Sequence, residues 1–361
     1  MKSTRRRIIV LFAALATLAA LLSSGPAQAN SKRELTVMTQ NLYLGASLTP
    51  AITATTELEF VEAVGTIYGT VLFTDFPTRS AQIAAVIKAS GADIIGLQEV
   101  SNWTVIGGGG AVPSLDFLEI LKSDLGPGYS VAAVSHNAML GPFPLALPDT
   151  PCAPILDAEE PPIFTCSVQF EDRDVIIVKD NPALVVTGSD SGNYDEQVRL
   201  SILGQPPLSF DRGWTLIDGT FEGKKFRFVN THLETEDWPD EQEAQAAEFL
   251  NGPAKTGGAV IAVGDFNSAA DGSTTSSYRA LTKSYFDDAW DVNAEEDGLT
   301  CCQNGTLTSF PSGLESRIDL VLTHAAARAV SAQVVGDNPF QSEPPFWPSD
   351  HAGVVAVIRI H

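Results

Sequence analysis

The sequence has few basic residues and few cysteines, and each shortage excludes a class of function. The 361-residue chain contains 22 Lys and Arg against 44 Asp and Glu, so its net charge is −22 at pH 7. This surface offers no broad attraction to a nucleic-acid backbone, and any phosphate ligand must therefore be held locally. None of the four cysteines has a C-x-x-C or Cys/His spacing, so the sequence does not have the pattern of a zinc site. With 44% hydrophobic and 18% charged residues, the composition is that of a globular protein.

An apolar run near the N-terminus predicts a targeting segment. Lys2 and Arg5–Arg7 precede the run Ile8–Leu22, and Ala27-Gln28-Ala29 follows it. This order is typical of a secretory signal, for which we expect cleavage after Ala29. A retained anchor is the alternative, although the run is short for a membrane-spanning helix. We therefore expect a secreted protein with no stable membrane insertion after cleavage.

Export to an oxidising compartment favours paired cysteines. Four cysteines allow three connectivities. Cys152 and Cys166 share a proline-rich stretch, where they would close a local loop, and we favour this pair. The adjacent Cys301 and Cys302 would pair only as a strained ring.

Short β-branched runs alternate with amphipathic segments along the chain, without repeats, heptads or a long linker. We therefore expect a single α/β domain over residues 30–361. The predicted strands are Leu35–Tyr43, Asp93–Glu99, Tyr129–His136, Asp174–Lys179, Trp214–Phe221, Lys225–His232, Ala259–Asp265, Arg317–Thr323 and Gly353–Ile360. The predicted helices are Phe76–Ala89, Leu115–Asp124, Asp240–Leu250 and Ser273–Lys283.

The segment from about Ser101 to Arg212 differs from the rest in its prolines, its Gly107–Gly110 run and its first two cysteines. We interpret it as an inserted region of elaborated loops within the same domain. Such loops either shape a substrate site or form a surface insertion held by a disulfide.

Polar residues at the ends of apolar strands are the candidate functional residues. A buried carboxylate needs a cation or several hydrogen-bond donors, so such positions indicate metal or phosphate chemistry. Taken singly, each has an ordinary structural interpretation: a solvated strand end, a structural histidine or a turn. The five endings contain Glu99, His232, Asp265 with Asn267, Asp319, and Asp350 with His351.

Together these residues carry a resemblance to a known superfamily. The ordered set is Gln40-Asn41, Gln98-Glu99, Asn230-Thr231-His232, Gly264-Asp265-Phe266-Asn267, Arg317-Ile318-Asp319 and Ser349-Asp350-His351. It resembles the endonuclease/exonuclease/phosphatase superfamily from Leu35 to the C-terminus. The resemblance implies a four-layered α/β sandwich of two packed mixed sheets flanked by helices.

The resemblance also implies roles for individual residues. Glu99 resembles the principal metal ligand, Asn41 a residue that helps to orient the metal or phosphate, and Asp350 a second acidic ligand. His232 resembles a phosphoryl contact, and Asn267 a phosphate donor. The remaining roles are that Asp265 positions or deprotonates the attacking water and that Asp319 orients His351.

The implied function is a divalent-metal-dependent phosphoester hydrolase using Mg²⁺ or Mn²⁺, with Ca²⁺ as a further alternative. Arg199 and Arg212 are candidate phosphate donors, against the alternative of surface ion pairs. We expect a monomeric phosphodiesterase or extracellular nuclease. The alternatives are a sphingomyelinase-like enzyme acting on a phospholipid or small organophosphate and, less favoured, a noncatalytic binding protein on the same fold.

Overall fold

The computed structural model describes residues 34–157, 160–203, 207–283, 285–293 and 296–361. The predicted signal segment lies outside these residues. Within the described part of the chain, no helix is both long and apolar enough to cross a membrane.

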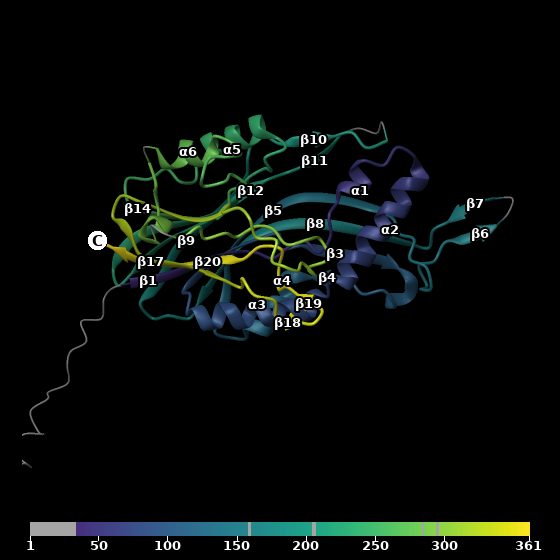
Figure 1. Cartoon of the computed structure of the whole chain (residues 1–361), viewed down its shortest axis with the longest axis horizontal. Helices are drawn as coiled ribbons and strands as arrows, with labels where there is room; N and C mark the ends of the chain where they lie inside the picture. Colours follow the sequence, from purple (N-terminus) through teal and green to yellow (C-terminus); the bar gives the residue numbers. More distant parts are fainter. Residues whose placement is uncertain (1–33, 158–159, 204–206, 284, 294–295) are drawn as a thin grey trace, which may run out of the picture. The chain divides into compact units, whose positions relative to one another are not determined.

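Two large mixed sheets form the centre of the unit Glu34–His361 (Figure 1). The first sheet has the order β17 (Ala327–Val335), β20 (Gly353–Ile360), β1 (Glu34–Asn41), β2 (Ile94–Gln98), β8 (Cys166–Lys179), β3 (Asn102–Gly107) and β4 (Leu115–Asp116), with β5 (Tyr129–Pro144) also paired to β8. The second has the order β15 (Asp287–Asp288), β16 (Asp319–His324), β14 (Ala259–Asp265), β13 (Lys224–His232), β12 (Gly213–Phe221) and β9 (Leu184–Asn193). Three short pairs complete the strands: β6 (Ile155–Asp157) with β7 (Glu160–Ile163), β10 (Val198–Leu200) with β11 (Leu208–Phe210), and β18 (Gln341–Ser342) with β19 (Pro345–Phe346).

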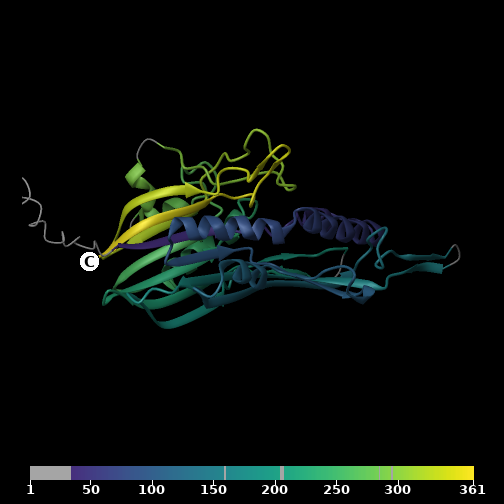
Figure 2. The ribbon, with the colours of Figure 1, turned by 90° about the horizontal axis from the view of Figure 1, so that it is seen from below.

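Helices cover the outer faces of both sheets and so complete four layers. The helices are α1 (Thr49–Ile52), α2 (Glu57–Phe73), α3 (Phe76–Ser90), α4 (Phe117–Leu125), α5 (Pro239–Asn251) and α6 (Ser277–Thr282). In Figure 1, α5 and α6 lie on one side of the sheets and α3 on the other. Figure 2 shows α2 and α3 following one another alongside the first sheet. The α/β sandwich implied by the resemblance is confirmed.

Three apolar cores hold these layers together. Leu35 and Ile176 of the first sheet pack with Phe228 and Ile261 of the second in the core between the sheets. A second core joins the first sheet to α2, α3 and α4, and a third joins the second sheet to α5 and α6. Because each sheet is covered on both faces, central strands such as β2 and β14 are buried along their whole length.

The strands predicted from the sequence are present with shifted boundaries, and β14 and β20 match the prediction in full. Helix α2 was missed because its glycines, threonines and β-branched residues disfavour a helix locally. It is capped by Thr56, whose Oγ1 accepts a hydrogen bond from the Glu59 backbone N–H, while the Glu59 side chain accepts one from the Thr56 N–H. Packing of Phe60, Val64 and Tyr68 into the core stabilises it further.

The expectation of mostly loops between Ser101 and Arg212 is wrong. This stretch contains the 16-residue strand β5, the 14-residue strand β8 and the whole of the second sheet's edge strand β9. Pairing of β5 with β8 satisfies the backbone although prolines and glycines interrupt the sequence pattern. The predicted Cys152–Cys166 disulfide is present, and Cys301 is bonded to Cys302.

Candidate active site

The predicted site residues meet because the strands that carry them end at the same edge of the two sheets. Strand β1 is parallel to β2, and β13 is parallel to β14, so the carboxyl ends within each pair coincide. His232 pairs in register with Asp265, and Asp265 pairs with Asp319 at the start of antiparallel β16. Gly264 permits this close approach, because a Cβ there would lie 2.0 Å from the Thr231 carbonyl oxygen.

Asn41 connects the two sheets at this edge. Its Nδ2 donates to Glu99 Oε1 at 3.2 Å and to Asp265 Oδ2 at 3.1 Å. The second oxygen of Glu99 accepts the Leu44 backbone N–H at 2.7 Å. Burial and the neighbouring Asp172 raise the pKa of Glu99. The carboxylate is thus held by neutral donors while it stays close to other acids.

His351 is held between two buried aspartates. Its Nδ1 lies 2.8 Å from Asp319 Oδ2, and its Nε2 lies 3.8 Å from Asp265 Oδ2. Burial acts to lower the pKa of His351, but the carboxylates of Asp319, Asp265 and Asp350 raise it well above the usual value. The Asp319–His351 hydrogen bond therefore favours an imidazolium with a fixed ring orientation.

His232 has the opposite electrostatic environment. Burial, Arg212 and His351 all lower its pKa, so the imidazole is neutral. Its Nε2 lies 3.5 Å from Asp265 Oδ2 and 3.1 Å from Asn267 Nδ2. The two histidines thus present one neutral and one cationic ring to the same carboxylate.

Asp265 lies between these rings and is itself a buried acid. Burial and Asp319 raise its pKa to about 7. The Asn267 backbone N–H donates to Asp265 Oδ1 at 2.9 Å and fixes the carboxylate. A carboxylate in this range is suited to accept a proton near neutral pH.

Asp350 lies at the loop before β20. Burial and the charge of Glu99 raise its pKa to about 7. The neighbouring Ser349 Oγ donates to the Asn41 carbonyl at 2.8 Å, which fixes this loop to the end of β1. Cys302 Sγ lies 3.8 Å from His351 Nε2, so the second disulfide packs against the site.

Arg79 is a buried structural residue that supports the loops of the site. Its Nη1 donates to the carbonyls of Leu42 at 2.8 Å and Pro348 at 2.9 Å, and its Nε donates to Thr74 at 2.8 Å. Burial lowers its pKa to about 10. The side chain therefore joins the loop after β1 to the loop before β20.

Of the two predicted phosphate donors, the structure places only Arg212 in the cluster. Its Nη1 lies 3.1 Å from His232 Nδ1, and its Nη2 donates to Glu234 Oε1 at 3.0 Å. The pair is largely buried, unlike the surface ion pair considered from the sequence. Arg199 is exposed on β10, and no side-chain contact between described residues joins it to the cluster.

Sequence reasoning missed two acids of the site. Asn137 Nδ2 donates to Asp172 Oδ2 at 3.1 Å and Asp174 Oδ2 at 3.0 Å. Burial raises the pKa of both acids. Strand β8 is antiparallel to β2, so an acid before its apolar run reaches the edge where β2 ends. The signal was available, because Asp174 begins the predicted strand Asp174–Lys179.

The donor chemistry fits a hard divalent cation. Burial and the charge of Glu99 raise the pKa of the Asp350 carboxyl, and Asn41 contacts Glu99, so these three residues lie close together. Ligand atoms of Asp172, Asp174 and neutral His232 also lie within 4.8 Å of one another. The Oδ1 atoms of Asp172, Asp174 and Asp319 are buried without a hydrogen-bond partner among the described residues. Uncompensated buried carboxylates of this kind are costly, and a cation nearby offsets that cost.

The chain belongs to the endonuclease/exonuclease/phosphatase family, whose model matches residues 38–351. The superfamily assignment made from the sequence is thereby confirmed. A search of curated proteins finds no match.

Solved structures of low sequence identity share the fold. A family protein from Bacteroides thetaiotaomicron has a TM-score of 0.56 and 15% identity over 90% of this chain and 94% of its own. A mannosyl-6-phosphatase from the same species has a TM-score of 0.54 and 15% identity over 90% and 99%. Humanized D. rerio TDP2 has a TM-score of 0.52 and 12% identity over 90% and 99%.

Proposed function

We propose that the protein is a metal-dependent hydrolase of phosphodiesters. The observation that carries the proposal is the buried arrangement of Asp265 between neutral His232 and cationic His351, with the His351 ring bonded to Asp319. This arrangement provides both a proton acceptor and positive charge in one site.

The roles of the residues follow from their charges. Asp265 orients the attacking water and accepts its proton. Its pKa of about 7 suits proton transfer near neutral pH. His351 donates to the phosphoryl oxygens or to the leaving group, and Asp319 stabilises its cationic form. His232 and Asn267 donate to the remaining phosphoryl oxygens, and Arg212 adds positive charge beside them.

Glu99, Asn41 and Asp350 would hold the metal, for which we propose Mg²⁺ or Mn²⁺. When bound, the cation supplies charge neutralisation at the phosphoryl oxygens. Asn41 connects Glu99 to Asp265, so the metal side and the water side of the site keep a fixed separation.

Two substrate classes remain candidates within this reaction. The net charge of −22 disfavours a long polyanion such as duplex DNA, because its phosphates outside the cluster would meet an acidic surface. A phosphodiester with a single phosphate, such as a phospholipid or a small organophosphate, avoids this repulsion. We therefore favour the second class over an extracellular nuclease.

We also propose that the protein is secreted after cleavage behind Ala29. The support is the order of basic residues, apolar run and Ala-Gln-Ala in the sequence. N-terminal sequencing of the secreted protein should begin at Asn30, and an N-terminus at Met1 would contradict the proposal.

The test of the hydrolase proposal is metal dependence at Glu99. Chelation should abolish hydrolysis of an aryl phosphodiester, and Mg²⁺ or Mn²⁺ should restore it. Glu99→Gln should raise the metal concentration needed for half-maximal rate, because the variant loses a charged ligand. Glu62→Gln removes the same charge from an exposed position on α2 and should leave that concentration unchanged. Full activity in excess chelator would contradict the metal-dependent mechanism.

A further inference from the structure

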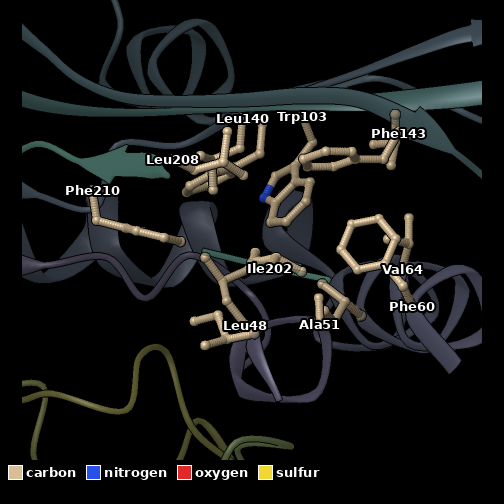
Figure 3. A pocket seen from close by; sticks show the side chains of 14 residues that line it. Leu48, Ala51, Phe60, Val64, Trp103, Leu140, Phe143, Ile202, Leu208 and Phe210 are labelled. Carbon is tan, nitrogen blue, oxygen red and sulfur yellow. The ribbon is translucent and has the colours of Figure 1, made fainter. Parts of the chain in front are cut away.

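An apolar pocket with a cavity of about 50 Å³ lies where α1, α2, β5, β8 and β11 face one another (Figure 3). Figure 3 shows its side chains extending from Leu208 and Phe210 at one end to Phe60, Val64 and Phe143 at the other. Every lining residue is apolar: Leu48, Ala51, Ile52, Phe60, Val64, Ile67, Trp103, Leu140, Phe143, Val168, Phe170, Ile202, Leu208 and Phe210.

Hydrogen bonds between side chains and the backbone of Leu44 connect this pocket to the candidate active site. Trp103, which lines the pocket, donates its Nε1–H to the Leu44 carbonyl at 2.9 Å. The N–H of the same Leu44 donates to Glu99 Oε2 at 2.7 Å. On another wall, Phe210 ends β11 two residues before Arg212, which contacts His232. The segments that position Glu99 and Arg212 thus also form the pocket walls.

The chemistry of the lining selects against polar occupants. The Trp103 indole N–H is the one polar side-chain group of the lining residues, and it is already bonded to Leu44. A nucleobase or a sugar placed there would lose its hydrogen bonds to water without replacement. An aliphatic chain loses none, and its flexibility suits a pocket lined along its length by both aliphatic and aromatic side chains.

We propose that this pocket binds the aliphatic chain of an amphiphilic phosphoester whose phosphate occupies the cluster at Asp265. The inference rests on the proposed function and names its substrate class. Leu44 is hydrogen-bonded both to Trp103 of the pocket lining and to Glu99 of the cluster, so the pocket adjoins the polar centre, and one molecule would place its phosphate in the cluster and its alkyl chain in the pocket.

Binding of phosphonates tests the pocket without requiring turnover, because their C–P bond is not a substrate for the hydrolase. We compare octylphosphonate with methylphosphonate by calorimetry on the Mg²⁺-supplemented protein. Each methylene that leaves water contributes about fourfold in affinity, so burial of three or four methylenes predicts a preference of about 100-fold. Equal affinities would overturn the inference.

Variants locate the binding site. Ala51→Trp fills the pocket from α1 and should lower octylphosphonate affinity to nearly that of methylphosphonate. Leu208→Asp, at a partly exposed position, should act in the same direction by placing a charge in the wall. Ala247→Trp adds the same ring on the exposed side of α5, outside the lining, and should keep the preference. If both folded pocket variants keep the full preference, the chain binds elsewhere and the inference is wrong.

Hydrolysis of methyl and octyl p-nitrophenyl phosphodiesters separates this inference from the proposed function. Cleavage of both diesters with equal kcat/KM would support the hydrolase proposal and reject the pocket assignment. Preferential octylphosphonate binding without cleavage of either diester would support the pocket and reject the hydrolase. A higher kcat/KM for the octyl diester, lost in Ala51→Trp, is the result that we expect.

Discussion

The strand-edge cluster and the apolar pocket are both hydrogen-bonded to Leu44, but they are assembled in different ways. The cluster draws one or two residues from each of many strand ends, from Asn41 to His351, and hydrogen bonds link its members. The pocket is lined by two or three residues from each of α2, β5 and β8, together with residues of α1 and β11, and its side chains meet through apolar surface. The cluster has directional contacts that fix its geometry, whereas every lining residue of the pocket except Trp103 can change without loss of a side-chain hydrogen bond. Chemistry and substrate choice are therefore separable by mutation.

The largest expected effect is on catalysis by the cluster. Asp319→Asn and His351→Ala should each lower kcat by about 10²-fold or more, because the proton-transfer group loses its charge or its ring. The double variant should be scarcely slower than the slower single variant, since the two residues act as one unit. Steady-state kinetics and thermal unfolding measure this. Multiplicative losses would show that the residues act independently, and a much lower unfolding midpoint would assign Asp319 a structural role.

Loss of Arg79 should lower the stability of the loops that support the cluster. Arg79→Met keeps much of the side-chain volume but leaves the carbonyls of Leu42, Pro348 and Thr74 without this donor. Unsatisfied buried acceptors cost about 1–3 kcal/mol each, so three of them predict a loss of at least about 3 kcal/mol in unfolding free energy. Denaturant titration measures it. Arg328→Met, at a half-exposed position on β17, is the matched control, and an equal loss there would contradict the prediction.

Removal of the Cys152–Cys166 disulfide should affect the pocket and spare the cluster. Both cysteines are buried in the apolar core that also contains Trp103 and Phe170. A loop of this size is worth about 3 kcal/mol, and the double Cys→Ala variant should lose about 2–3 kcal/mol. The octyl-over-methyl preference should fall while kcat for the methyl diester stays constant. A fall in kcat with an unchanged octyl-over-methyl preference would show that the disulfide supports the cluster and not the pocket.

The smallest expected effect is a pH-dependent stabilisation by metal. Asp265 and Asp350 have folded-state pKa values of about 7, above the usual 3.8, so the folded protein binds more protons than the unfolded chain between about pH 4 and 7. Their contribution to stability is present below about pH 4 and is lost as pH rises through about 7. Mg²⁺ compensates the resulting charge, so it should raise Tm by more at about pH 8 than at about pH 5. Calorimetry with and without chelator measures this, and a shift independent of pH would contradict it.

The sequence predicted the cluster better than the pocket for a physical reason. A charged residue at the end of an apolar run is visible locally, which is why Glu99, His232 and Asp265 could be found. Asp172 and Asp174 escaped because they precede their apolar run, and only the antiparallel direction of β8 places them at the same edge. Arg199 was included because an arginine in the sequence does not reveal the direction of its side chain.

The pocket has no local signal of this kind. Periodicity shows that Phe60 or Phe170 is apolar, but not that their side chains leave a void between them. Helix α2 was missed because tertiary packing of residues such as Val64 stabilises it against weak local propensity. The length of β5 and β8 depends on their pairing with each other, which a single segment does not encode.

The position of β20 has a consequence for the order in which the protein matures. This last strand lies between β17 and β1, so its residues pair with a strand more than 300 positions earlier in the chain. While a ribosome is still making the chain, β1 lacks this neighbour, and His351 is absent from the site. Contacts of such long sequence separation form late in folding. The cluster is therefore complete only after residues 351–360 have been made and β20 has paired with β1.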